Sequence, residues 1–133
     1  MSSLSKNTSE ILAPISIGEL IDKMTILEIK QIHMTGINLK NIDKELKLLK
    51  NIIQDKNLEI DIDLINNLKE VNKKLWKIED NIRIKESNQK FDKEFIQLAR
   101  SVYKENDKRA SIKKEINQKY NSELVEEKSY NNY

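Results

Sequence analysis

Apolar residues recur at alternating steps of three and four along most of this chain. One such series is Leu39, Ile42, Leu46, Leu49 and Ile53, and another begins at Leu64 and continues through Leu68, Val71, Leu75, Ile78 and Ile82. This spacing is typical of helices that bury one narrow face against a neighbouring helix. Only two glycines and one proline occur in 133 residues, so little in the sequence would interrupt a long helix.

The spacing therefore predicts an all-α fold, an antiparallel bundle of about four helices with a long C-terminal helix. The first helix is expected over residues 17–34, with Ser16 and Glu19 as a capping box and Gly36 in the turn that ends it. The others are expected over residues 39–54, from 61 or 63 to 86, and from 91 to 120 without a break. We expect three parts: a flexible segment over residues 1–13, one helical domain over 14–122, and a polar tail over 123–133.

Composition excludes several classes of function. The chain has no cysteine, which rules out disulfides and zinc held by thiolates. Basic and acidic residues nearly balance, at 24 and 22, and this argues against a dedicated nucleic-acid binder. No apolar run approaches the length needed to span a membrane, and the first residues contain no apolar signal region. We therefore expect a cytoplasmic protein that does not bind a membrane.

The apolar stripes of three predicted helices are interrupted by polar residues. At about 100° per residue, Glu28 falls near the centre of the first stripe, and Glu79 and Glu86 fall close to the third. The last stripe passes through Asn106, Arg109 and Lys113 before it returns to apolar residues. Because these positions carry opposite charges, the acidic residues are predicted to pair with the basic ones. Arg109 is the strongest candidate, since arginine suits bidentate pairing and only three of the 24 basic residues are arginine.

We call these polar positions in the apolar stripes the polar seam. Three interpretations of it stay open. It could be a buried ion network that fixes how the helices align, a pocket for a small anionic ligand, or a catalytic metal site. The candidate ligand-binding residues follow from the seam: Glu28, Glu79, Arg83, Glu86, Asn106, Arg109 and Lys113. No cofactor is assigned, and no catalytic residue is identified. Mg²⁺ enters only in the metal interpretation, with Glu28, Glu79 and Glu86 as ligands.

Four stretches resemble an uncharacterised family of small helical proteins found in bacteria and in phages of marine bacteria. They are "SIGELIDKMTILEIK", "LWKIEDNIR", "FDKEFIQLARSVYKENDKRASIKKEIN" and "EEKSY", and the resemblance extends from Pro14 to Tyr130. It implies an autonomous domain in a phage or bacterial setting. It transfers no catalytic residue, because the family has no assigned activity.

A second, partial resemblance is to the all-helical nucleotide pyrophosphohydrolases, which hold Mg²⁺ with ExxE and ExxD pairs on adjacent helices. Here "ELID" places Glu19 and Asp22 in an ExxD arrangement, but the matching ExxE is missing. We therefore expect a helical binding or assembly module with a charge-complementary polar cluster in its core. The alternative is a Mg²⁺-dependent nucleotide phosphohydrolase. A homo-oligomer is expected, with a small anionic ligand or another protein as further candidate partners.

Overall fold

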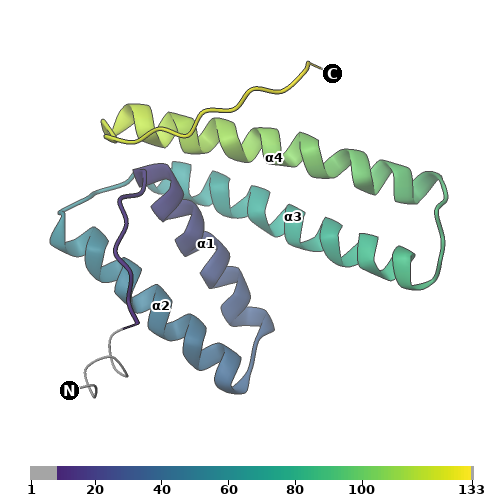
Figure 1. Ribbon diagram of the computed structural model, residues 1–133, viewed down its shortest axis with the longest axis horizontal. Helices are drawn as coiled ribbons and strands as arrows, with labels where there is room; N and C mark the ends of the chain where they lie inside the picture. Colours follow the sequence, from purple (N-terminus) through teal and green to yellow (C-terminus); the bar gives the residue numbers. More distant parts are fainter. Residues whose placement is uncertain (1–8, 133) are drawn as a thin grey trace.

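The computed structural model describes residues 9–132 and confirms the predicted all-α class. Within these residues it contains four helices and no strand (Figure 1). The helices are α1 (Ile17–His33), α2 (Gly36–Asp55), α3 (Ile62–Ser87) and α4 (Lys93–Lys119). Part of the predicted flexible segment, residues 1–8, and the last residue of the predicted tail lie outside the described residues. Residues 9–15 form no helix or strand and are exposed. No helix in the described part is long and apolar enough to cross a membrane.

Helix α1 begins where the sequence predicts. The hydroxyl of Ser16 accepts a hydrogen bond from the backbone N–H of Glu19 at 3.0 Å, which satisfies one of the free donors at the start of the helix. The other half of the predicted capping box differs, because the Glu19 side chain pairs with Lys113 of α4 instead. Gly36 lies two residues beyond Met34, the C-cap of α1, and is the first residue of α2. Its φ angle of +62° is in the left-handed region that favours glycine.

Helices α3 and α4 form a long antiparallel hairpin whose two ends are each tied by a carboxylate. Asp61 caps α3 and binds Lys119 at 3.0 Å, while Asp92 caps α4 and binds Lys85 at 3.0 Å. The N–H of Phe95 and the ammonium of Lys85 both lower the pKa of Asp92. Helix α4 is continuous through its polar stretch, as predicted, because no glycine or proline interrupts it.

Helix α1 is the central helix of the fold and packs against each of the other three (Figure 1). On one side Leu27 packs with Ile42 and Leu46 of α2. On the other side Ile21 joins a second core that contains Leu64, Leu68 and Ile116 of the α3–α4 hairpin. The structure thus consists of two helical hairpins, α1–α2 and α3–α4, which meet through α1. The hairpins diverge from each other away from this contact (Figure 1).

The α3–α4 hairpin is buried over only half of its length. From Trp76 to Ile112, which includes the turn, no side chain is buried. The buried residues of the hairpin all lie in the other half, at Leu64–Leu75 on α3 and Lys113–Asn117 on α4. We call residues 76–112 the distal hairpin. Apart from its inner end, where Arg109 binds Asp22 and the Trp76 ring stacks on His33, it extends beyond the region that α1 covers.

Beyond Tyr120 the chain reverses and runs back along α4 as an extended tail (Figure 1). Ser122 anchors the start of this tail to the start of α1, because its hydroxyl accepts a hydrogen bond from the N–H of Ile17 at 3.0 Å. The same hydroxyl donates to the carbonyl of Leu124 at 2.7 Å. The tail is thereby directed across the surface of α4.

Gly18 allows the first turn of α1 to approach the backbone of α4 closely. A Cβ atom at this position would lie 2.5 Å from the carbonyl oxygen of Lys113 and 3.0 Å from Oδ1 of Asn117. That same amide oxygen accepts a hydrogen bond from the N–H of Gly18 at 2.6 Å. Because the obstacle is backbone, a larger residue could be accommodated only by moving one helix away from the other.

Gly18→Ala is therefore expected to destabilise the fold by about 1–3 kcal/mol, the usual cost of overpacking. Alanine at an exposed helical position instead stabilises by up to about 1 kcal/mol relative to glycine. The measurement is the midpoint of urea unfolding followed by helical circular dichroism. Asn41→Ala, at an exposed position of α2, is the control and should be neutral or slightly stabilising. A stabilised Gly18→Ala variant would contradict the close approach.

Candidate functional site

A carboxylate with no solvent exposure lies at the point where α1 meets the α3–α4 hairpin. Asp22 of α1 is completely buried. Its Oδ1 accepts hydrogen bonds from Nδ2 of Asn72 on α3 at 2.9 Å and from Nε of Arg109 on α4 at 3.0 Å. Its Oδ2 accepts a further bond from Nη2 of Arg109. The guanidinium thus binds both oxygens, a bidentate geometry that lysine does not provide.

Lys113, one turn further along α4 than the half-buried Arg109, is a buried cation. Its Nζ lies 2.6 Å from Glu19 of α1, 3.5 Å from Glu126 of the tail and 4.0 Å from Asp22. The stem of Lys113 is buried together with its ammonium group. Carboxylates from two separate segments of the chain therefore converge on one lysine.

Neutral polar groups complete the network. The Thr25 hydroxyl donates to the carbonyl of Asp22 at 2.7 Å and accepts from Nδ2 of Asn72 at 2.9 Å. The Asn72 amide therefore bridges Asp22 and Thr25, and all three side chains are buried. Buried polar groups are costly unless they are hydrogen-bonded, and here each has a partner within the network.

The charges of this cluster nearly cancel. Three carboxylates, from Glu19, Asp22 and Glu126, face the two cations Arg109 and Lys113. The hydrogen bonds to Asp22 raise the pKa of Arg109 above its ordinary value, and Glu19 and Glu126 add smaller electrostatic contributions in the same direction. We call these five residues together with Thr25 and Asn72 the Asp22 cluster. Its chemistry is that of a satisfied ion network, which fixes how α1 aligns against α3 and α4.

A small hollow of about 170 Å³ opens beside the cluster. Arg109, Lys113 and Lys128 line it, but so do Glu19 and Glu126. An anion bound there would meet carboxylates as well as cations. The small anionic ligand considered from the sequence stays a prediction, and the signs of the lining residues do not favour it.

The cations of the cluster, Arg109 and Lys113, are those that the sequence predicted. The prediction that Glu28, Glu79 and Glu86 are their acidic partners is wrong. Glu28 binds Lys69 at 3.4 Å, and Glu79 binds Arg83 at 3.7 Å on the exposed surface of α3. Glu86 is exposed in the last turn of α3. Asn106, the remaining candidate, is half-buried and lies next to the tail.

The physical reason is the level at which α1 crosses the hairpin. Contacts at its two ends, Asp61 with Lys119 and Lys85 with Asp92, set the alignment of α3 against α4. Arg109 is then level with Asn72, so Glu79 lies about 10 Å further along α3 at 1.5 Å per residue. Glu86 lies about another 10 Å beyond that. A helical wheel gives the face of a residue and not its level against a partner helix.

Asp22 and Glu19 are two acidic residues of the cluster that the argument from the interrupted stripes missed. They form the "ELID" pair noted for its resemblance to metal-binding motifs, and their carboxylates are bound by arginine and lysine. Across residues 9–132, no group of three or more acidic or histidine side chains is arranged to hold a metal ion. In particular, Glu28, Glu79 and Glu86, the ligands expected for Mg²⁺, are not brought together.

The sequence comparisons define the family of this helical domain. A model described as a family of unknown function, DUF6165, matches residues 11–133. Because the match covers nearly the whole chain, the chain belongs to this family. The comparisons with curated proteins and with solved structures gave no match.

Arg109→Met is expected to destabilise the fold by about 3–5 kcal/mol, because it leaves the fully buried Asp22 carboxylate without its cation. Replacing both partners, as Asp22→Leu with Arg109→Met, should restore most of the loss, since no buried charge is then left alone. The measurement is the free energy of unfolding in urea for both single variants and the double variant.

The matched control is Arg83→Met, which removes a guanidinium from the exposed pair with Glu79. Exposed pairs contribute at most about 1 kcal/mol, so this variant should stay close to wild type. Equal losses for Arg83→Met and Arg109→Met would show that the Asp22 pair is no more important than a surface ion pair.

Proposed function

We propose that this chain is a helical assembly module that binds a second copy of itself through the distal hairpin. The observation that supports the proposal most directly is that no side chain from residue 76 to residue 112 is buried. Two helices alone have little interior between them, so a hairpin of this length needs another element to cover its apolar side. Apart from the contacts of Asp22 and His33 at the inner end, the chain's other two helices lie against the opposite half of α3 and α4 and against each other.

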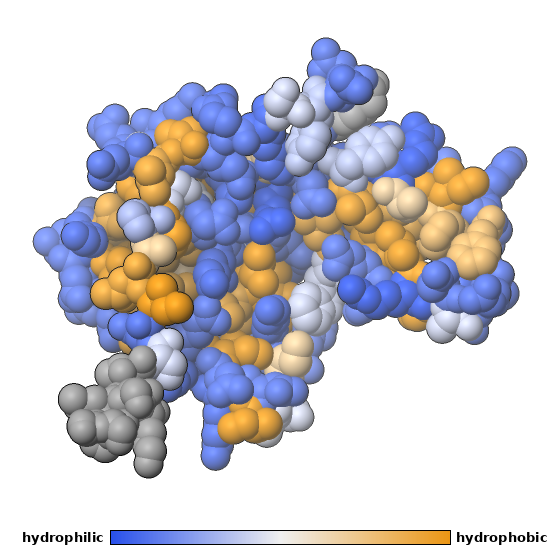
Figure 2. All heavy atoms as spheres, in the orientation of Figure 1, coloured by the Kyte–Doolittle hydropathy of each residue, from blue (hydrophilic) through white to orange (hydrophobic). Residues whose placement is uncertain are grey.

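The distal hairpin carries large apolar side chains that remain in contact with solvent. Ile84 is 57% exposed, Phe91 is 53% exposed and Ile96 is 54% exposed. Figure 2 shows an apolar patch spread over this half of the hairpin. Single exposed apolar residues are ordinary on protein surfaces, but a continuous patch on two adjacent helices is typical of an interaction surface.

The apolar residues of the distal part of α4 lie on two sides of the helix. At about 100° per residue, Phe95 and Val102 lie on the same side of α4 as Arg109 and Lys113. Phe95 and Val102 are half-buried, whereas the exposed Ile96 and Tyr103 lie about 100° further round α4. The exposed side of α4 is therefore available to a helix of a second copy.

The charges of the distal hairpin favour a second copy as the partner. Residues 76–112 contain nine basic and seven acidic side chains, so the surface has no strong net charge. A nearly balanced surface does not suit a nucleic acid, which selects an excess of positive charge. It can complement itself across a two-fold axis, because each basic region then meets an acidic region of the other copy.

In this proposal the Asp22 cluster is structural. It holds α1 at one level of the hairpin and so leaves the distal half uncovered. The proposed setting is the cytoplasm of a bacterium or of a phage-infected cell, which rests on the sequence resemblance.

The test is the molar mass in solution, measured by light scattering over a range of concentrations. The wild type is expected to be a dimer at high micromolar concentration. Phe91→Glu combined with Ile96→Glu should shift it to a monomer, because buried unpaired carboxylates oppose association. Ile37→Glu is the matched control, since Ile37 is 69% exposed but lies on α2. It should leave the dimer intact. A wild type that stays monomeric at high micromolar concentration would overturn the proposal.

A further inference from the structure

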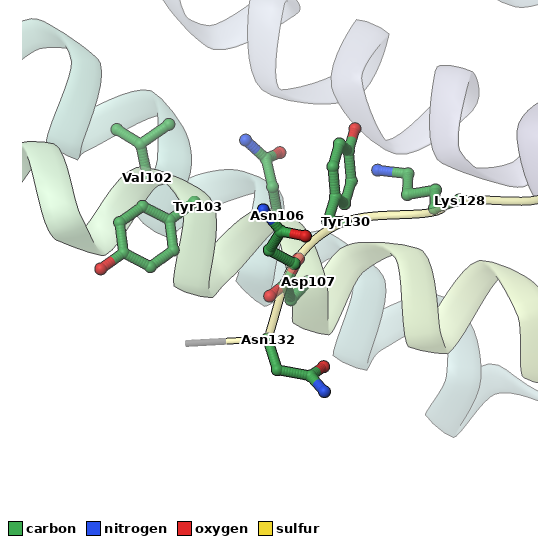
Figure 3. Close-up of a pocket in the computed structure, with 8 residues that line it drawn as sticks. Val102, Tyr103, Asn106, Asp107, Lys128, Tyr130 and Asn132 are labelled. Atoms are coloured by element: carbon green, nitrogen blue, oxygen red, sulfur yellow. The ribbon is translucent and has the colours of Figure 1, made fainter.

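The C-terminal tail crosses α4 at the inner end of the distal hairpin. Figure 3 shows the tail passing over Asn106 and Asp107, with Tyr130 and Lys128 on the same stretch of tail. Tail residues and α4 residues together line a hollow of about 1100 Å³ that includes Val102 and Tyr103. The tail therefore lies where the contact between α1 and α4 ends, beyond Arg109, and next to the exposed apolar side of α4 at Tyr103.

Polar contacts of the described tail residues tie the tail to the rest of the fold near its start. Ser122 fixes its start, and Glu126 binds the buried ammonium of Lys113 at 3.5 Å. Beyond Glu126, the ammonium of Lys128 lies 5.7 Å from the centre of the Tyr130 ring, which is a contact within the tail itself. The apolar side chains of the tail remain partly or largely exposed, and Tyr130 is 75% exposed. Half-exposed ion pairs contribute little to stability, and the described tail residues bury little apolar surface, so the tail is suited to local displacement.

The tail is also too small to fill the space that it covers. A hollow of about 1100 Å³ remains between Tyr130 and α4, although its lining includes the apolar side chain of Val102. A helix from a second copy, packed on the exposed side of α4, would need this same space. The tail and the incoming copy would therefore compete for the inner end of the surface.

We propose that the tail is a displaceable cover that weakens self-association by occupying the inner end of the distal hairpin. This inference rests on the proposed assembly function and adds its regulation. The Glu126–Lys113 ion pair is the contact that keeps the cover closed. Its loss shifts the population toward the uncovered state, to which the second copy binds more tightly.

The test compares Glu126→Lys, which places a cation against Lys113, with Glu127→Lys as its control. The control makes the same change of charge at the next residue of the tail. Tail position is read by NMR from a nitroxide attached to Asn131→Cys, which can be labelled at one place because the natural chain has no cysteine. With the tail closed, the nitroxide should broaden the amide signals of residues 102–107. Glu126→Lys should remove the broadening, and Glu127→Lys should retain it.

Self-association of the same variants is measured by sedimentation equilibrium without the nitroxide. Because one half-exposed ion pair holds the tail, Glu126→Lys should tighten the dimer by about two- to five-fold. Glu127→Lys should leave the dissociation constant unchanged. If Glu126→Lys releases the tail but leaves the constant unchanged or weakens association, the inference is wrong although the assembly function stands. If the wild type shows no broadening, the tail does not lie on α4 and the inference is also wrong. If no variant associates at all, the proposed function is wrong as well.

Discussion

A completely buried carboxylate, Asp22, sets the arrangement of the helices in this protein. A buried charge is tolerated only when an opposite charge and hydrogen-bond donors meet it. Those groups come from Asn72 on α3 and Arg109 on α4, so three helices must meet at one level for the carboxylate to be satisfied. An apolar contact could slide by a turn at modest cost, whereas this contact cannot. The close approach at Gly18 follows from the same alignment, since it brings α1 against the backbone of Lys113.

The position of the Asp22 cluster divides the α3–α4 hairpin into two unlike halves. The half next to the cluster packs against α1 and contains all the buried residues of the hairpin. The other half carries exposed apolar side chains, among them Ile84, Phe91 and Ile96, without a third helix to cover them. The level at which α1 crosses α3 and α4 thus determines both which part of the hairpin is buried in the core and which part is exposed. The assembly function and the role of the tail are proposals built on that division.

Much of the fold could be predicted from the sequence because the apolar residues of an amphipathic helix recur at regular spacing. The spacing of three and four and the scarcity of glycine and proline predicted the helices to within about three residues at each end. The polar positions Arg109 and Lys113 were predictable because they interrupt an apolar stripe. Their partners were not, because the pattern of a helix gives a face and carries no information on the level of contact with another helix. Glu79 has a suitable face and the wrong level. Asp22 lies off the predicted apolar stripe of α1 and is buried because α1 is covered by three helices. The need for glycine at position 18 was also hidden, since it depends on a neighbour almost one hundred residues away.

Amide hydrogen exchange of the wild type at two protein concentrations tests the division of the molecule most directly. Amides of α1 and of the parts of α3 and α4 that face it should be strongly protected at both concentrations, because the Asp22 cluster holds them within one chain. Amides of the distal hairpin should exchange rapidly in dilute protein and become protected as the concentration rises. Equal and strong protection of both halves in dilute, monomeric protein would contradict the account, because the distal hairpin would then be stable without a partner.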